Sequence, residues 1–139
     1  MIYDILQVHG DTVRYELELC GRLTIVGGDS GTGKSFLSTL VSNRKLNERD
    51  MQDVSIFSYK SGITLAEFLT VMQGKKHLLI IDNYDAFASR EAAELIAGDE
   101  VNQYLIFARY ARFLPVSKYN YRELLEQDGV ITLVRGKTA

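Results

Sequence analysis

Residues 28–35 read Gly28-Asp29-Ser30-Gly31-Thr32-Gly33-Lys34-Ser35, which fits the phosphate-binding pattern of glycine, four further residues and Gly-Lys-Ser/Thr. For a chain of this composition, roughly 0.005 accidental matches to the pattern are expected. The glycines allow positive φ angles and let the backbone approach phosphate oxygens closely. The backbone N–H groups of such a loop converge on an anion at the N-terminus of a helix. The alternative interpretation is a glycine-rich turn between a strand and a helix, with an incidental lysine.

The segments on either side of this loop come in the order that the pattern requires. The apolar run 23–26 before it reads as a strand. A helix is expected over 34–44 after it, because apolar residues recur there at helical spacing: Phe36, Leu37, Leu40 and Val41. The sequence therefore predicts a strand, the phosphate loop and a helix in succession.

With this loop as a Walker A motif, the chain resembles the P-loop NTPase superfamily, and residues 77–82 (HLLIID) resemble a Walker B segment. A continuous apolar run suits a strand buried on both faces of a parallel sheet, and ligands bind at the carboxyl ends of such strands. The resemblance implies that the chain binds ATP or ADP together with Mg²⁺. It also implies that Lys34 contacts the phosphates and that Ser35 and Asp82 hold the metal ion. The alternative interpretation of Asp82 is an ordinary Asp-Asn turn after a strand.

The residues that the resemblance assigns to the nucleotide form one continuous segment: Gly28, Asp29, Ser30, Gly31, Thr32, Gly33, Lys34, Ser35 and Phe36. The guanine-reading sequence Asn-Lys-x-Asp is absent, which favours adenine as the base.

The hydrophobic periodicity predicts an α/β fold. Residues 2–8 and 13–19 read as an antiparallel β-hairpin, and further strands are expected at 54–57, 77–82, 104–108 and 130–134. Helices are expected after the capping box of Thr64 and Glu67, over 89–97, and as a short helix after a second box of Asn120 and Glu123.

Alternating strands and helices imply a mostly parallel sheet with helices on both faces. We therefore expect a three-layer α/β/α, P-loop NTPase-like sheet with five parallel strands and the hairpin added to it. One domain should span 1–139, with residues 1–20 as the hairpin addition and 21–135 as the core. In the matching subclass of P-loop proteins, another strand lies between the Walker A and Walker B strands.

Hydrolysis of ATP requires a group that positions or deprotonates water. Related ATPases have glutamate directly after the Walker B aspartate, whereas this chain has Asn83, which can orient water but cannot accept its proton. Asp85 could substitute for that glutamate, or it could be a solvated turn carboxylate. Arg109 follows the strand at 104–108, and it or Arg112 could contact the γ-phosphate in the same chain or in a neighbouring copy. The competing interpretation of both arginines is surface solvation.

These observations predict an ATP-binding, Mg²⁺-dependent protein with slow or partner-stimulated hydrolysis. The expected catalytic residues are Lys34, Asp82, Asn83 and Arg109. The alternatives are a nucleotide-dependent switch that does not hydrolyse ATP, and a small-molecule kinase in which Arg109 and Arg112 cover the transferred phosphate.

Charges are unevenly distributed along the chain. Residues 101–122 contain no acid but four basic residues interleaved with aromatics, whereas residues 82–100 contain six acids and a single arginine. Tyrosine and arginine are favoured at protein interfaces, so we expect a protein partner or a homo-oligomer through residues 104–122. Single-stranded nucleic acid could bind such a segment, but the net charge of −2 disfavours it. The remaining interpretation is a solvated face whose aromatic side chains pack inward.

The bulk properties add few constraints. The 139 residues are 46% hydrophobic and 24% charged, which suits one globular core. No apolar run approaches the ~20 residues of a membrane-spanning helix, and no signal-like segment is recognised at the N-terminus. Cys20 is the single cysteine and reads as a structural thiol. A cytoplasmic location is the resulting expectation.

Overall fold

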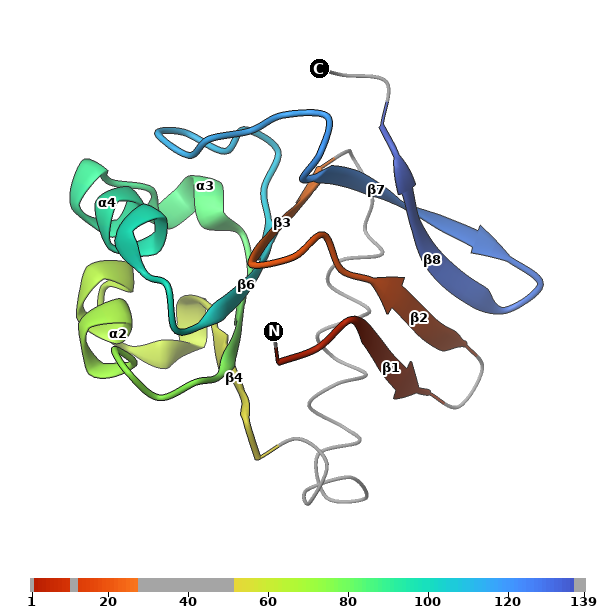
Figure 1. Cartoon of the computed structure of the whole chain (residues 1–139), viewed down its shortest axis with the longest axis horizontal. Helices are drawn as coiled ribbons and strands as arrows, with labels where there is room; N and C mark the ends of the chain where they lie inside the picture. The colour runs from red at the N-terminus through yellow and green to blue at the C-terminus, as the bar shows by residue number, and fades with distance from the viewer. Residues whose placement is uncertain (1, 11–12, 28–51, 137–139) are drawn as a thin grey trace.

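The computed structural model describes residues 2–10, 13–27 and 52–136, and eight strands pair there into one sheet (Figure 1). The strands are β1 Ile5–His9, β2 Arg14–Glu18, β3 Leu23–Gly27, β4 Val54–Phe57, β5 Leu78–Ile81, β6 Gln103–Phe107, β7 Tyr121–Gln127 and β8 Val130–Arg135. The helices are the 3-10 helix η1 Tyr59–Ser61 and the α-helices α2 Leu65–Val71, α3 Tyr84–Phe87 and α4 Arg90–Gly98. No helix of the described residues is both long and apolar enough to span a bilayer.

The sheet has the order β1-β2-β8-β7-β3-β6-β5-β4. The last five strands in this order run parallel to one another, while β8 and β2 run in the opposite direction. Strand β6 pairs with β3 on one side and with β5 on the other. One strand therefore separates β3, which precedes the sequence pattern of residues 28–35, from β5, which precedes Asp82.

The central parallel strands β3, β5 and β6 are buried on both faces, as their apolar sequences predict. On one face, alternate residues such as Ile25, Leu79 and Ile106 pack with α2 and α4. On the other face, Leu78, Ile80 and Leu105 belong to a second apolar cluster with residues of the outer strands. The contributions of the outer strands are Leu6 and Val8 from β1, Tyr15 and Leu17 from β2, and Ile131 from β8.

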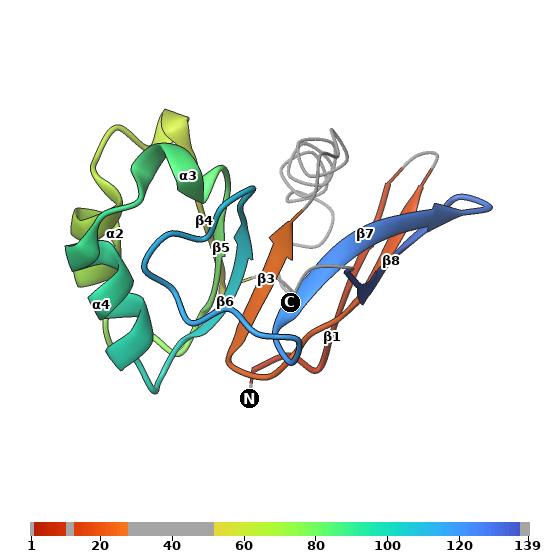
Figure 2. The same cartoon turned by 90° about the horizontal axis from the view of Figure 1, so that it is seen from above.

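The expectation of a three-layer α/β/α fold is wrong. The described structure is mostly β, with one strongly curled, mixed sheet in place of a flat parallel sheet between two helix layers. In Figure 2 the helices α2, α3 and α4 gather on one face of the parallel strands, and β1, β7 and β8 bend away from them. The curl brings apolar residues of β1, β2 and β8 into the cluster on the face that lacks these helices. Sheet twist and coiling, which hydrophobic periodicity does not report, account for the difference.

The helix expected after Asn120 is also wrong, because residues 121–127 form strand β7. Asp128 and Gly129 both have positive φ, at 53° and 79°, as a two-residue type I′ hairpin turn requires, and they join β7 to β8 in antiparallel pairing. Asn120 does not cap a helix; its side chain accepts from the Ser117 N–H at 2.9 Å and donates to the Pro115 carbonyl at 2.7 Å. The fifth parallel strand is therefore β7, and the strand expected at 130–134 runs antiparallel to it.

Other local predictions are confirmed. Strands β1 and β2 form the expected antiparallel hairpin. The Thr64 hydroxyl accepts the Glu67 N–H at 3.1 Å, and the Glu67 carboxylate accepts the Thr64 N–H at 2.9 Å, which completes the capping box of α2. The Ser89 hydroxyl accepts the Ala92 N–H and caps α4. Helix α3 was not expected, and the helix expected over 34–44 lies outside the described residues.

A buried polar cluster surrounds Asp99, which precedes β6 and is 4% exposed. Its carboxylate accepts hydrogen bonds from the Tyr104 hydroxyl at 2.6 Å and from the backbone N–H groups of Val101 and Asn102. Burial acts to raise the pKa of Asp99, but the hydrogen bonds from Tyr104, Asn102 and Val101 outweigh it and hold the pKa below its usual value. The Arg22 guanidinium donates to the Asp99 carbonyl at 2.9 Å. This cluster ties the start of β3 to the start of β6.

Candidate functional site

The carboxyl ends of the parallel strands bring Gly27, Asp82 and Arg109 to one edge of the sheet. Val26 pairs with Phe107, and Ile81 pairs with Ile106, so these strands end at nearly the same level. Because β6 lies between β3 and β5, two strand spacings put the Cα atoms of Gly27 and Asp82 about 10 Å apart. The predicted nucleotide residues 28–36, including Lys34 and Ser35, lie outside the described residues.

Gly27 is the last residue before the phosphate-binding pattern, and it is buried against Tyr121 of β7. A Cβ atom at this position would lie only 2.2 Å from the Tyr121 hydroxyl oxygen. A Cβ atom at Gly136 would lie 2.4 Å from Cε2 of the same ring. The Tyr121 hydroxyl donates to the Glu123 carboxylate at 3.0 Å. Two glycines thus make room for one tyrosine ring beside the start of the loop.

Sequence reasoning did not assign Tyr121 to the site. It noted this tyrosine only as one of the aromatic residues among the basic ones. No local signal could have revealed its contact with Gly27, because the contact depends on the parallel pairing of β3 with β7. The segment that contains Tyr121 was expected to be helical.

Asp82 directly follows β5 and is half-buried. Its backbone N–H donates to the Phe57 carbonyl at 2.9 Å, which continues the pairing of β5 with β4. Among residues 2–10, 13–27 and 52–136, no three His, Cys, Asp or Glu side chains are grouped as a metal site. Mg²⁺ in nucleotide sites is held by one or two carboxylates together with phosphate oxygens and water. A single carboxylate at a strand end, as Asp82 provides, therefore fits that donor set.

Asn83 has a left-handed backbone, with φ 52° and ψ 51°. Asparagine tolerates this conformation better than most residues that carry a Cβ, whereas glutamate has no such preference. The side chain of Asn83 is exposed and does not cap α3. The backbone therefore provides a physical reason for asparagine at position 83.

Asp85 contacts the backbone of the segment that follows β6. Its carboxylate accepts the backbone N–H of Arg109 at 2.6 Å and the backbone N–H of Tyr110 at 2.7 Å. Both oxygens are thus used to hold the segment that follows β6. Asp85 therefore positions the backbone that carries Arg109.

Tyr84 also holds the segment of residues 109–112. This fully buried residue donates its hydroxyl to the Arg112 carbonyl at 2.6 Å. Burial, and to a lesser extent the neighbouring Asp85 carboxylate, raises the pKa of Tyr84 to about 12. The phenol therefore remains a hydrogen-bond donor at physiological pH, and Tyr84 and Asp85 together fix residues 109–112.

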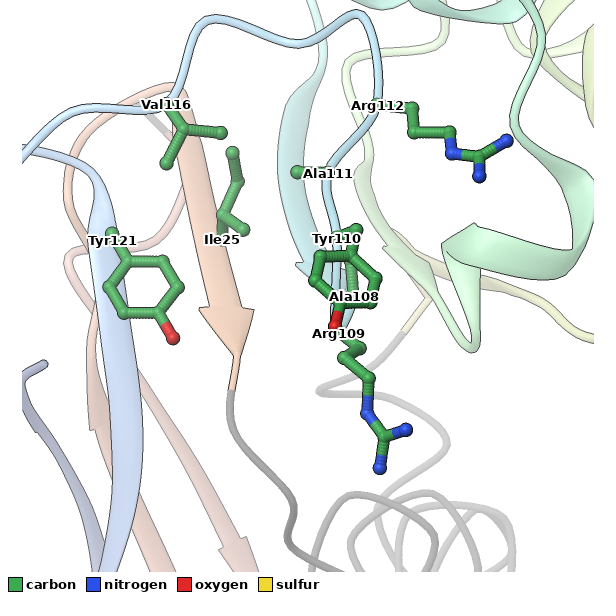
Figure 3. Close-up of a pocket in the computed structure, with 8 residues that line it drawn as sticks. All are labelled: Ile25, Ala108, Arg109, Tyr110, Ala111, Arg112, Val116 and Tyr121. Atoms are coloured by element: carbon green, nitrogen blue, oxygen red, sulfur yellow. The ribbon is translucent and has the colours of Figure 1, made fainter. Parts of the chain in front are cut away.

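A pocket of about 450 Å³ opens between this segment and the neighbouring strands β3 and β7 (Figure 3). The lining is mainly apolar and consists of Ile25, Ala108, Arg109, Tyr110, Ala111, Arg112, Val116 and Tyr121. In Figure 3 the ends of the Arg109 and Arg112 side chains extend away from the pocket and in different directions. The structure thus brings the backbones of both arginines to the pocket but does not converge their guanidinium groups.

Comparison with known proteins gives no match: no family model fits the chain, and no curated protein or solved structure is significantly similar to it.

Proposed function

We propose that this chain binds a nucleoside triphosphate, preferably ATP, and hydrolyses it slowly or when a partner stimulates it. The observation that carries the proposal is where the phosphate-binding pattern occurs. It begins directly after Gly27, the last residue of β3, and Asp82 follows β5 at the same edge of the sheet. Ligands of parallel sheets bind at this edge.

Each residue of the proposed site has a distinct task. Lys34 contacts the phosphates through its ammonium group, and the backbone of residues 28–33 surrounds them with N–H donors. Ser35 and Asp82 would hold Mg²⁺, which supplies charge neutralisation on the phosphate oxygens when it is bound. Arg109, whose backbone is fixed by Asp85, is the candidate cation for the γ-phosphate.

A second candidate function is a nucleotide-dependent switch that does not hydrolyse ATP. The observation that favours it is Asn83, which offers an exposed amide in place of a carboxylate at the position after Asp82. An amide orients water but accepts no proton near neutral pH. The two candidates share the binding site and differ only in turnover.

A cytoplasmic location remains part of the proposal, because a lone cysteine suits a reducing compartment.

The test is a single-turnover assay with excess protein, trace γ-labelled ATP and Mg²⁺. Wild type is compared with Lys34→Ala and with Lys75→Ala, a matched control at an exposed lysine on the segment before β5. Labelled phosphate from wild type and Lys75→Ala, but not from Lys34→Ala, supports the ATPase. Intact ATP that only wild type and Lys75→Ala retain supports the switch. If wild type neither retains nor cleaves ATP, the proposal fails.

A further inference from the structure

The connection between β6 and β7 has an exposed surface, and the proposed nucleotide site uses only Arg109 of it. We call residues 109–119 of this connection the basic loop. Four of its large apolar side chains are exposed: Tyr110 by 68%, Phe113 by 50%, Val116 by 41% and Tyr119 by 70%. The same loop carries Arg109, Arg112 and Lys118 and no acidic residue. Apolar patches of this kind mark interaction surfaces more often than scattered exposed residues do.

Helix α4 adjoins the basic loop and carries the opposite charge. The Arg90 guanidinium, at the first residue of α4, lies 4.8 Å from the centre of the Phe113 ring. Glu91 and Glu94 are exposed on the same helix. In the described part of the chain, Arg112 and Lys118 form no ion pair with these glutamates.

We propose that the basic loop and the exposed acidic side of α4 together form a two-fold interface between two copies of this chain. In a two-fold dimer the same patch is used by both copies, so it must be self-complementary. Here one patch carries cations on the loop and carboxylates on the adjoining helix, and a two-fold arrangement brings each set against the opposite set of the second copy. The exposed aromatic residues supply the apolar centre that such interfaces require.

The pocket beside the basic loop gives this surface a cavity that a side chain of the second copy can enter. It has a volume of about 450 Å³, and its lining is mainly apolar, with Ile25, Ala111 and Val116 among its members. An aromatic side chain that projects from the loop of the second copy is a suitable occupant for a cavity of this kind. Aromatic anchors in apolar pockets carry much of the energy of protein interfaces.

Two contacts favour a second copy over single-stranded nucleic acid. Base stacking needs free aromatic faces, but Arg90 covers one face of Phe113, and the Lys118 ammonium lies 5.2 Å from the centre of the Tyr119 ring. In addition, Glu91 and Glu94 follow Arg90 on α4, and Arg90 contacts the Phe113 ring, so these carboxylates would repel phosphates bound to the loop. The same carboxylates attract the basic loop of a second copy. The proposal does not depend on nucleotide binding.

The test is a charge exchange read by sedimentation velocity on full-length protein. Arg112→Glu and Glu94→Lys should each weaken the wild-type dimer about tenfold or more, because each places like charges across the interface twice. An equimolar mixture of the two variants should recover the dimer, since the heterodimer has opposite charges at both contacts. Arg135→Glu and Glu126→Lys are matched controls at exposed positions on β8 and β7 and should leave the dimer unchanged. Far-UV circular dichroism verifies that every variant is folded.

Three results would overturn the proposal. The first is a wild-type protein that stays monomeric at on the order of 100 μM, a concentration at which even weak dimers with micromolar affinity are populated. The second is a dimer that both single variants weaken but their mixture does not recover. The third is a monomer that binds a fluorescent single-stranded oligonucleotide with steep salt dependence, which would assign the basic loop to nucleic acid.

Discussion

Asp85 holds the backbone of Arg109: its Oδ2 atom accepts the Arg109 N–H at 2.6 Å, while its Oδ1 atom accepts the N–H of Tyr110 at 2.7 Å. This connection joins the turn after β5 to the turn after β6 at the edge of the sheet where Asp82 also lies. The Asp85 carboxylate therefore positions the backbone of its neighbours at this edge.

Asp85→Asn should lower both stability and order in the segment that carries Arg109. The substitution replaces one acceptor oxygen with an NH₂ group that faces an N–H donor, and loss of this exposed hydrogen bond should cost about 0.5–1.5 kcal/mol. Urea denaturation measures the change, and Glu126→Gln, at an exposed position of β7, is the control for loss of charge alone. An unchanged free energy of unfolding together with abolished ATP turnover would instead indicate that Asp85 is the base.

Asn83→Ala and Asn83→Gly should differ in stability although both remove the amide. At φ 52° the alanine variant loses about 1–2 kcal/mol, because a Cβ is strained in the left-handed region, while glycine adopts this conformation freely. Chemical denaturation of the two variants measures that difference. Turnover is then compared at equal folded fraction, where an equal decrease in both assigns a role to the amide. Equal stabilities would contradict the backbone argument.

Gly27→Ala should destabilise the protein by about 1–3 kcal/mol, because the added Cβ overlaps the Tyr121 ring. The effect should be much smaller in a Tyr121→Ala background, where that ring is absent. A double-mutant cycle of four proteins, measured by guanidinium denaturation, tests this coupling. Strictly additive effects of the two substitutions would show that the ring does not limit the space at Gly27.

The contribution of Asp99 should depend on pH with a defined sign. Its pKa is lowered in the folded protein, so its stabilisation is present above the unfolded value of about 3.9 and is lost as pH falls through the lower folded value. Asp99→Asn should therefore be less stable than wild type at pH 7, and the difference should shrink below about pH 4. Thermal unfolding from pH 7 to pH 2.5 measures it. A difference that stays constant over this range would show that the carboxylate charge contributes nothing.

Local sequence signals predicted most of the individual elements. The alternation of Tyr15 and Leu17 with charged residues gave strand β2, and the reciprocal pair Thr64 and Glu67 gave the start of α2. Both signals act within a few residues of the chain, where backbone preferences and short-range hydrogen bonds dominate. The strand at 54–57 was located for the same reason.

Two local signals compete at the end of the chain. Asn120 and Glu123 match a capping box, but Asp128-Gly129 is a strong hairpin signal that pairs the same residues with β8. Pairing with β3 on the other side adds a second set of backbone hydrogen bonds to β7. Tertiary pairing thus overrides a helical start signal that lacks a buried helical face.

Features of the candidate site that depend on tertiary structure could not be predicted in the same way. The contact of Tyr121 with Gly27, and the hydrogen bonds from Arg109 and Tyr110 to Asp85, join residues from different strands and turns. The curl of the sheet likewise arises because small twists between neighbouring strands accumulate over many strands. The sequence could place only Asp82 and Arg109 at the edge of the sheet, because each of them follows an apolar strand.

The pairing of β2 with β8 affects how the polypeptide folds during synthesis. Arg14 of the hairpin formed by β1 and β2 pairs with Val130, more than 100 residues later, and in the described part of the chain the strand pairing of this hairpin with the rest of the sheet is through β8. Until residue 132 has left the ribosome, Leu6, Val8, Tyr15 and Leu17 lack the β8 partner that anchors their hairpin. Such non-local pairing slows folding and leaves apolar strand surface exposed to aggregation or to chaperones. Folding of this chain should therefore be completed late, after release of its last strand.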